Sequence, residues 1–214
     1  MNLKKGDFVE IEYTGKVKST GEVFDTTSEE IAKQHGLYDE NNSYGAVAVC
    51  LGAEQLLPGL DSALVGKEVG KTYTIEVSPE EGFGKKDPKL LRLIATSKFR
   101  RQGITPVPGL RINIDGVIGT IKTVTGGRTI VDFNHPLSGQ VVEYEVKIVK
   151  KLSKPDEKLG ALIRVELLDK NPKLEITDGK AKLKLSQEYP KELLDKFKEK
   201  ALKLIPELSE IEFE

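Results

Sequence analysis

The segment from Leu56 to Gly66, Leu-Leu-Pro-Gly-Leu-Asp-Ser-Ala-Leu-Val-Gly, constrains the fold of this 214-residue chain more than any other. Pro58 suits the first turn of a helix, where its missing N–H is not needed, and Gly66 suits the left-handed position just past the end. Apolar residues recur between them at helical spacing: Leu57, Leu60, Ala63 and Leu64. A helix this short needs tertiary packing. Two roles stay open for the leucines at its start: core packing, or the floor of a pocket.

Alternating patterns on both sides of this helix predict the strands of one sheet. Apolar and polar residues alternate over 8–17, 71–77 and 140–150, and shorter strands are expected at 22–27 and 47–51. Several short strands with one helix favour an α+β fold, in which an antiparallel sheet wraps on the short helix.

Composition weakens several classes of function. The net charge of −1 gives no support for binding to nucleic acid or to an anionic membrane. No apolar run approaches membrane-spanning length, and the first residues lack the apolar core of a signal peptide. Cys50 is the single cysteine, so an intrachain disulfide is excluded, which favours a reducing compartment. We therefore expect a cytoplasmic protein that binds neither nucleic acid nor membrane.

Most signatures of catalysis are missing from the chain. His35 and His135 are far apart and have no partners at metal-ligand spacing, and there is neither a nucleophile elbow nor a phosphate-binding glycine loop. We therefore expect no metal site and no cofactor. What remains is a set of aromatic residues, leucines and one acid: Tyr13, Phe24, Asp25, Leu57, Leu60, Phe83 and Tyr144. The strand aromatics among them could equally be core residues, and the acid could be a turn residue.

The middle of the chain predicts an inserted domain. Three short strands separated by Asp-Gly and Gly-Gly turns are expected within residues 111–133. We predict four segments: a first part of the main domain, an insert of mostly β structure, the last part of the main domain, and a separate α+β C-terminal domain. Their boundaries are 1–86, 87–131, 132–152 and 153–214.

The C-terminal residues predict a compact unit after a linker at 151–157. A helix is expected at 159–168 with Asp156 as its cap, followed by a hairpin at 173–186 that turns at Asp178-Gly179 and by an amphipathic helix. The hairpin places its apolar residues on one face. If that face is exposed, it favours a homodimer through the C-terminal domain or a second polypeptide-binding surface.

Leu-Pro-Gly-Leu-Asp-x-Ala-Leu-x-Gly-x-x-Val-Gly, from Leu57 onward, resembles the central segment of the FKBP-type peptidyl-prolyl isomerases. Val-Phe-Asp-Thr-Thr at 23–27 resembles the Phe-Asp-Ser/Thr signature of that family. The resemblance implies that Tyr13, Phe24, Asp25, Leu57, Leu60, Phe83 and Tyr144 line an apolar pocket that rotates Xaa-Pro bonds. Leu60 stands where small eukaryotic members carry Trp, Phe83 where the family usually has Tyr, and Tyr144 where it usually has Phe.

Asn-His-Pro-Leu-Ser-Gly at 134–139 is similar to the Asn-His-x-Leu-Ala-Gly segment of SlyD-like and archaeal FKBPs. Those proteins carry a chaperone domain inserted in the flap, and the folded C-terminal unit resembles the long-type archaeal members. The resemblance implies a folding chaperone that acts on unfolded polypeptides with Xaa-Pro bonds. Seven apolar residues of the insert are candidates for binding them, about half of which are expected to be core: Leu91, Leu93, Ile94, Phe99, Ile104, Val107 and Leu110. The alternative is a polypeptide-binding chaperone without isomerase activity.

Overall fold

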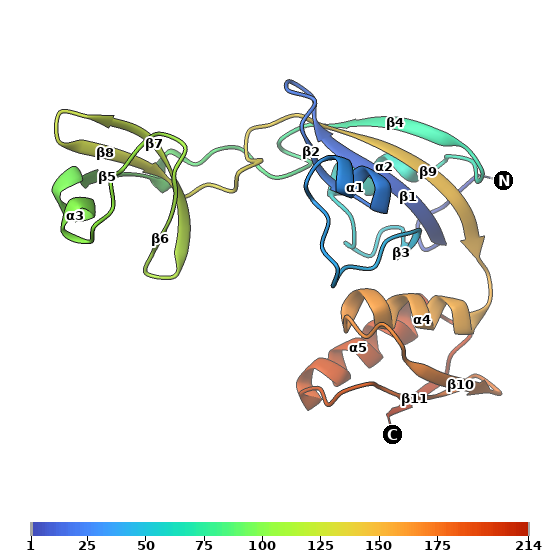
Figure 1. Cartoon of the computed structure of the whole chain (residues 1–214). Helices are drawn as coiled ribbons and strands as arrows, with labels where there is room; N and C mark the ends of the chain where they lie inside the picture. Colours follow the sequence, from blue (N-terminus) through green and yellow to red (C-terminus); the bar gives the residue numbers. More distant parts are fainter. Residues whose placement is uncertain (1, 214) are drawn as a thin grey trace. The chain divides into compact units, whose positions relative to one another are not determined.

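The chain forms two compact units, one of which interrupts the other (Figure 1). The computed structural model describes residues 2–213. The first unit joins the residues up to Gly82 with those from Val141 onward, and the second unit is the segment Phe83–Gln140 between them. The predicted insert, 87–131, lies inside the second unit.

The first unit is built on an antiparallel sheet of five strands. Its strands are β1 (Phe8–Val17), β2 (Val23–Thr26), β3 (Val47–Cys50), β4 (Thr72–Val77) and β9 (Val142–Leu152). The order is β2-β1-β9-β4, and β3 also pairs with β1. Strand β9, which follows the second unit in the chain, lies between β1 and β4, so the sheet is complete only when both parts of the first unit come together.

Helix α2 (Pro58–Leu64) confirms the helix predicted from the central segment. Pro58 occupies its first turn, and Gly66 adopts a φ of +84° just beyond its end. Leu60 and Leu64 are buried. Gly59 permits a close approach to the sheet, because a Cβ there would lie 2.9 Å from a methyl carbon of Val77 on β4. A second short helix, α1 (Glu29–Gln34), follows β2.

The second unit is a four-stranded antiparallel sheet with one helix. Its elements are the 3-10 turn η1 (Pro88–Leu90), β5 (Leu91–Ala95), α3 (Thr96–Arg101), β6 (Arg111–Ile114), β7 (Val117–Thr125) and β8 (Arg128–Asp132). The order is β5-β8-β7-β6. Its buried cluster comprises Phe99, Ile112, Ile121 and Val131.

The C-terminal region, residues 153–213, holds two helices and a three-stranded sheet. They are α4 (Pro155–Glu166), β10 (Lys173–Thr177), β11 (Lys180–Lys184), α5 (Lys191–Leu204) and β12 (Glu210–Phe213). The predicted turn at Asp178-Gly179 is confirmed, since Leu174 pairs with Leu183 and Ile176 with Ala181 on either side of it. The last strand, β12, pairs with β11 in parallel.

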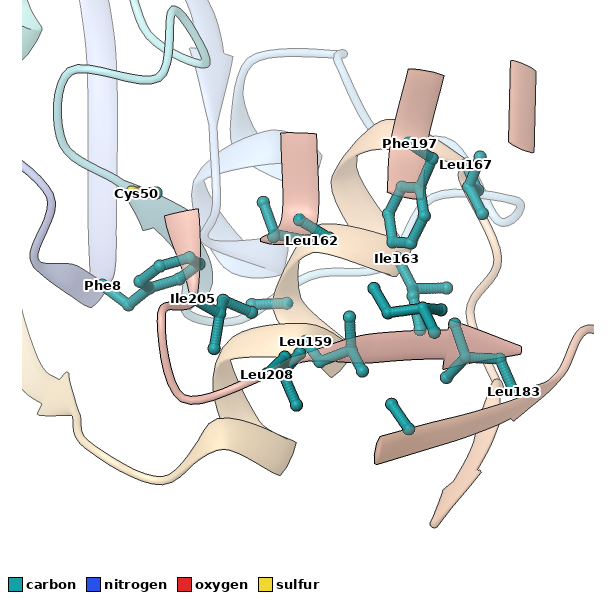
Figure 2. Close-up of a cluster of buried hydrophobic side chains, with 14 of the residues drawn as sticks. Phe8, Cys50, Leu159, Leu162, Ile163, Leu167, Leu183, Phe197, Ile205 and Leu208 are labelled. Carbon is teal, nitrogen blue, oxygen red and sulfur yellow. The ribbon is translucent and has the colours of Figure 1, made fainter. Parts of the chain in front are cut away.

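The apolar face of this hairpin is buried, which corrects the expectation of an exposed face. Ala181 and Leu183 lie in one core with side chains of α4 and α5, and that core also contains Phe8, Cys50 and Leu152 of the main sheet (Figure 2). Packing within the chain therefore covers the face that was expected to be available for a partner.

Two local expectations at the start of this region are also corrected. The linker predicted at 151–157 is much shorter, because β9 continues to Leu152 and α4 begins at Pro155. Lys154, not Asp156, occupies the N-cap position. Asp156 lies in the first turn, where its negative charge interacts favourably with the helix dipole and stabilises the helix. The proline starts the helix four residues before Leu159, where the apolar periodicity begins.

Candidate isomerase pocket

Three aromatic rings meet on one face of the main sheet. Tyr13 comes from β1, Phe24 from β2 and Tyr144 from β9. The Tyr144 ring packs edge-on against both others, with ring centroids 5.8 Å from Tyr13 and 5.8 Å from Phe24. Tyr144 is 4% exposed, whereas the other two rings are half-buried. This geometry gives an aromatic floor with two partly open walls.

Gly15 makes this arrangement of rings possible. It pairs with Tyr144 across β1 and β9 and with Asp25 across β1 and β2. A Cβ at Gly15 would lie 2.8 Å from the Tyr144 ring and 2.9 Å from the Phe24 ring, which is closer than packed atoms tolerate. Sequence analysis missed this residue, although a glycine inside a strand pattern is a known sign of close approach.

Tyr13 is fixed by a hydrogen bond from its phenol to an acid. The Tyr13 hydroxyl donates to Asp25 Oδ2 at 2.9 Å. Burial, reinforced by the charge of Asp25, raises the pKa of Tyr13 well above its ordinary value, so the phenol stays protonated and remains the donor. Thr27 holds the Tyr13 backbone as well, since its hydroxyl accepts from the Tyr13 N–H at 2.8 Å.

Helix α2 supplies the aliphatic candidates. Leu60 is 2% exposed and belongs to the core, and Leu57 is half-buried at the N-cap position, where it bears no capping side chain. One methyl carbon of Leu57 lies 4.0 Å from the point where a Cβ would stand at Gly82. Gly59 and Gly82 therefore both allow close packing against Val77 at this end of the helix.

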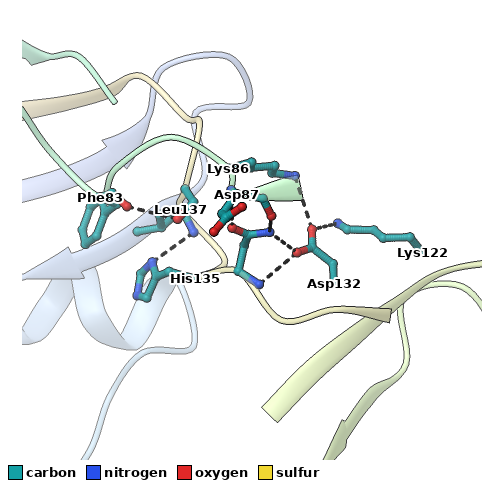
Figure 3. Close-up of polar contacts among 9 residues, drawn as sticks. Phe83, Lys86, Asp87, Lys122, Asp132, His135 and Leu137 are labelled. Atoms are coloured by element: carbon teal, nitrogen blue, oxygen red, sulfur yellow. Dashed lines mark hydrogen bonds and ion pairs between the residues drawn. The ribbon is translucent and has the colours of Figure 1, made fainter. Parts of the chain in front are cut away.

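Phe83 belongs to the second unit, and its ring is stacked on a histidine. Its ring centroid lies 4.9 Å from that of His135, with an interplanar angle of 3°. Ser138 Oγ donates to the Phe83 carbonyl at 3.0 Å, and His135 Nδ1 accepts from the Leu137 N–H at 3.2 Å (Figure 3). The motif at 134–139 therefore positions the aromatic residue that the sequence comparison with the family singled out.

Asn134 ties together the two chain segments that lead into and out of the second unit. Its Oδ1 accepts from the Asp87 N–H at 2.8 Å, and its amide nitrogen donates to Asp132 at 2.8 Å (Figure 3). Lys86 and Lys122 lie 3.6 Å and 3.8 Å from the other Asp132 oxygen. Burial of Asp132 opposes its ionisation, but the Asn134 hydrogen bonds and the two lysines outweigh burial and lower its pKa.

The seven apolar candidates of the second unit divide into core and surface. Phe99 is buried, and Ile94, Ile104 and Leu110 pack against the same cluster, so these four serve the unit's own fold. Phe99 is therefore corrected from a candidate binding residue to a core residue. The remaining three are exposed: Leu91 by 43%, Leu93 by 62% and Val107 by 50%.

Sequence analysis missed the other exposed apolar residues of this sheet. Val117 and Ile118 on β7 are 53% and 66% exposed. Ile118 alternates with Gly119, which faces the core side chain of Val131, so Ile118 points to the outer face of the sheet. Leu93 shares that face, because it alternates with the core residue Ile94. Composition alone does not distinguish the residues on the exposed face of the sheet from those packed in its core.

Other features of the described residues do not fit a proline site. A hollow that Tyr13 also borders is lined mainly by polar and charged residues such as Thr14, Glu145 and Lys147, and these three alternate away from the Tyr144 ring. Residues 2–213 include no cluster of His, Cys, Asp and Glu suited to a metal ion. Burial raises the pKa of the Cys50 thiol to about 11, which makes it a poor nucleophile. No helix within residues 2–213 is long and apolar enough to cross a membrane.

Comparison with known proteins identifies the class to which this fold and site belong. The family model "FKBP-type peptidyl-prolyl cis-trans isomerase" matches residues 1–99, and the model "FKBP26, IF domain" matches residues 92–137. A short-type peptidyl-prolyl cis-trans isomerase of Methanocaldococcus jannaschii is 33% identical over 146 residues, which cover 68% of this chain and 92% of that protein.

SlyD proteins from bacteria are similar as well. The FKBP-type isomerase SlyD of Treponema pallidum is 28% identical over 167 residues, 76% of this chain and 86% of that protein. SlyD of Haemophilus influenzae is 33% identical over 128 residues, 57% of this chain and 66% of that protein. The chain belongs to the FKBP-type peptidyl-prolyl cis-trans isomerases, with SlyD-like relatives.

Proposed function

We propose that Xaa-Pro bonds rotate in the pocket formed by Tyr13, Phe24, Leu57, Leu60 and Tyr144, with Asp25 orienting the site. The observation that carries this proposal is the buried Tyr144 ring between the two half-buried aromatic rings. Phe83, which the family resemblance adds to this set, stays a prediction.

An apolar pocket of this kind needs neither a nucleophile nor a metal. The uncatalysed rotation faces a barrier of about 18–20 kcal/mol because amide resonance holds the bond planar. Resonance separates charge, and removing water from the prolyl amide disfavours the planar, charge-separated form relative to the twisted one. The aromatic rings supply the dry surface against which the proline ring packs.

Asp25 has an orienting role in this proposal. Its carboxylate accepts the Tyr13 hydroxyl, which leaves it engaged as an acceptor, and the raised pKa of Tyr13 keeps the proton on the phenol. The pair holds the Tyr13 ring against Tyr144 and needs no proton transfer during rotation.

The second unit supplies a separate surface for unfolded polypeptide. Leu91, Leu93 and Ile118 lie exposed on the outer face of its sheet, and exposed apolar groups of this kind mark interaction surfaces. A chain held there is kept at high effective concentration near the pocket. The substrates are unfolded or partly folded polypeptides with Xaa-Pro bonds, and a cytoplasmic location agrees with the single, buried Cys50.

A homodimer through the C-terminal region would have to use a surface other than the hairpin's apolar face, because that face is buried. Exposed Leu168, at 78%, is one apolar residue that remains on the surface of this region.

The test is isomerisation of a short proline tetrapeptide, followed by cis/trans exchange in NMR spectra, with Tyr144→Ala as the altered pocket. We expect the wild-type chain to accelerate exchange and the variant to lose about tenfold or more, as misplacement in a preorganised site does. Absence of acceleration by the folded wild type would instead favour a polypeptide-binding chaperone that has no isomerase activity.

A further inference from the structure

The loop between β3 and α2, residues 51–57, connects the pocket to the C-terminal region. It carries Leu56 and Leu57 to the start of α2. Ala53, in the middle of the loop, is buried in the apolar core that includes α4 and α5. The Gln55 amide nitrogen donates to Glu166 Oε1, at the end of α4, over 2.8 Å. The last segment before the pocket therefore rests on residues outside the isomerase sheet.

Gln55 links two partners with its two amide atoms. Its Oε1 accepts from the Cys50 N–H at 2.8 Å. A backbone N–H can only donate, so the oxygen must face Cys50 and the amide nitrogen must face Glu166. The amide orientation is therefore fixed by its partners, and one side chain closes the loop onto β3 while it also fastens the loop to α4.

Glu166 is itself held from a third element. Lys200 Nζ on α5 lies 2.7 Å from the same Glu166 oxygen, and the Glu166 side chain is 25% exposed. Because the acceptor is charged and partly withdrawn from water, its hydrogen bond to Gln55 is stronger than one between neutral groups. The C-terminal region thus presents a fixed acceptor to the loop.

The rest of the loop is anchored within the isomerase part. The Gly52 N–H donates to both Asp61 oxygens, at 3.0 and 2.8 Å. Glu54, next to Gln55, adopts a φ of +61°, in the left-handed region that non-glycine residues occupy only when neighbouring contacts hold them there. Gln55 and Ala53 flank Glu54, and their contacts with the C-terminal region hold it in this conformation.

We propose that Glu166 is a positioning residue for isomerisation: through Gln55 it fixes the loop that places Leu56 and Leu57 at the pocket. This inference rests on the proposed function of the pocket. It gives the C-terminal region a role in the reaction, because α4 holds the loop before the pocket through this polar contact.

The test exchanges the polarity of the contact in the full-length chain. Gln55→Glu keeps an acceptor for the Cys50 N–H but removes the donor and sets two carboxylates together. We expect kcat/KM for the tetrapeptide to fall about fivefold, within the range of coupled polar contacts. Glu166→Gln keeps an acceptor but removes its charge, so it should cost less than Gln55→Glu. The double substitution Q55E/E166Q restores a donor–acceptor pair in reverse and should recover most of the loss.

Glu207→Gln is the matched control, since it weakens the 2.5 Å ion pair between Lys158 and Glu207 within the C-terminal region and touches neither the loop nor α2. We expect its kcat/KM to equal that of the wild type. Glu166→Ala leaves the loop sequence intact and should reproduce the loss of kcat/KM expected for Gln55→Glu. It replaces Gln55→Glu in the test if that variant does not fold.

The outcomes separate the two claims. A folded wild-type chain that does not isomerise the tetrapeptide would contradict the proposed function. An active wild type with unchanged kcat/KM in Gln55→Glu and Glu166→Ala would overturn the positioning role alone. A double variant that stays as slow as Gln55→Glu would also overturn it, because the loss would then be a general effect on the fold.

Discussion

The two compact units bury their apolar residues to very different extents. In the first unit, the sheet and the C-terminal region share a core to which β1, β3, β9, α4 and α5 all contribute. In the second, Phe99, Ile112, Ile121 and Val131 form the buried cluster, and the outer face of the sheet carries exposed leucine and isoleucine. A sheet covered on one face by a single short helix leaves the other face for binding.

This difference matches two different tasks. The pocket of the first unit fixes its aromatic rings by Gly15 and by the Tyr13–Asp25 hydrogen bond, which suits one kind of bond in one geometry. The outer face of the second unit carries exposed apolar side chains such as Leu93 and Ile118, which suit contacts with many sequences. We therefore expect changes to the pocket to act on the rate of rotation, and changes to the outer face to act on the capture of a long chain.

The largest expected effect is a cavity in the smaller core. Ile121→Ala should destabilise the second unit by about 2–5 kcal/mol, as buried large-to-small substitutions do, and unfold it while the first unit stays folded. Hydrogen exchange resolved by residue is the measurement. Ile163→Ala, equally buried in the larger core, is the matched control; we expect it to lower the stability of the first unit only. Simultaneous unfolding of both units by Ile121→Ala would contradict the claim that the two units have separate cores.

A smaller effect is expected on the rate of rotation. Gly15→Ala places a methyl group against the Phe24 and Tyr144 rings, so the rings must separate, and overpacking of this kind costs about 1–3 kcal/mol. We expect kcat/KM for the tetrapeptide to fall about tenfold. Gly160→Ala, where the added Cβ would lie at an ordinary contact distance of 3.6 Å from Leu174, controls for the loss of a glycine. Full activity in Gly15→Ala would show that the ring arrangement does not matter.

Exposed leucines of the second unit should affect long substrates only. Leu91→Ser with Leu93→Ser should slow catalysed refolding of a proline-limited protein about fivefold, since apolar area for capture is lost. Tetrapeptide turnover should be unchanged, and stability should move by less than about 0.5 kcal/mol, as at other surface sites. Leu168→Ser, at an exposed leucine of the C-terminal region, is the control. Equal losses in both assays would contradict separate roles.

The smallest expected effect is on the stability of the second unit at acidic pH. The folded-state pKa of Asp132 is lowered, so its ionised form adds stability above the unfolded-state pKa of about 3.9. That stability is lost as the pH falls through the lower, folded-state value. Above pH about 4, the second unit should therefore be more stable than the same unit with Asp132→Asn, and this advantage should disappear as the pH falls below that value, measured by NMR against pH. Parallel acid profiles for the two proteins would contradict this role of Asp132.

The sequence predicts much of the local structure because the patterns are strong. The proline and glycine around Leu57–Leu64 mark helix α2, and Asp178-Gly179 sets the register of the last hairpin. Both depend on backbone preferences of single residues, which are visible without tertiary contacts.

What the sequence does not predict depends on contacts between distant segments. Whether Leu183 is buried or exposed depends on the packing of α4 and α5 over the hairpin, which its alternation cannot specify. The same holds for Phe99 and Leu93, which are equally apolar but lie in the core and on the surface of the second unit. Gly15 and the Gln55–Glu166 contact belong to this class too, because Tyr144 and Glu166 lie more than a hundred residues from Gly15 and Gln55.

The measurement that tests the account most directly compares two substrates and two proteins. The full chain is compared with a variant in which residues 88–131 are replaced by a short glycine-serine loop, which keeps Asp87, Asp132 and Asn134. Both are assayed on a proline tetrapeptide and on refolding of a reduced protein limited by proline isomerisation. The account predicts that the shortened chain still rotates the tetrapeptide bond but loses most of its activity on the protein. Equal activity of both chains on the protein would contradict it.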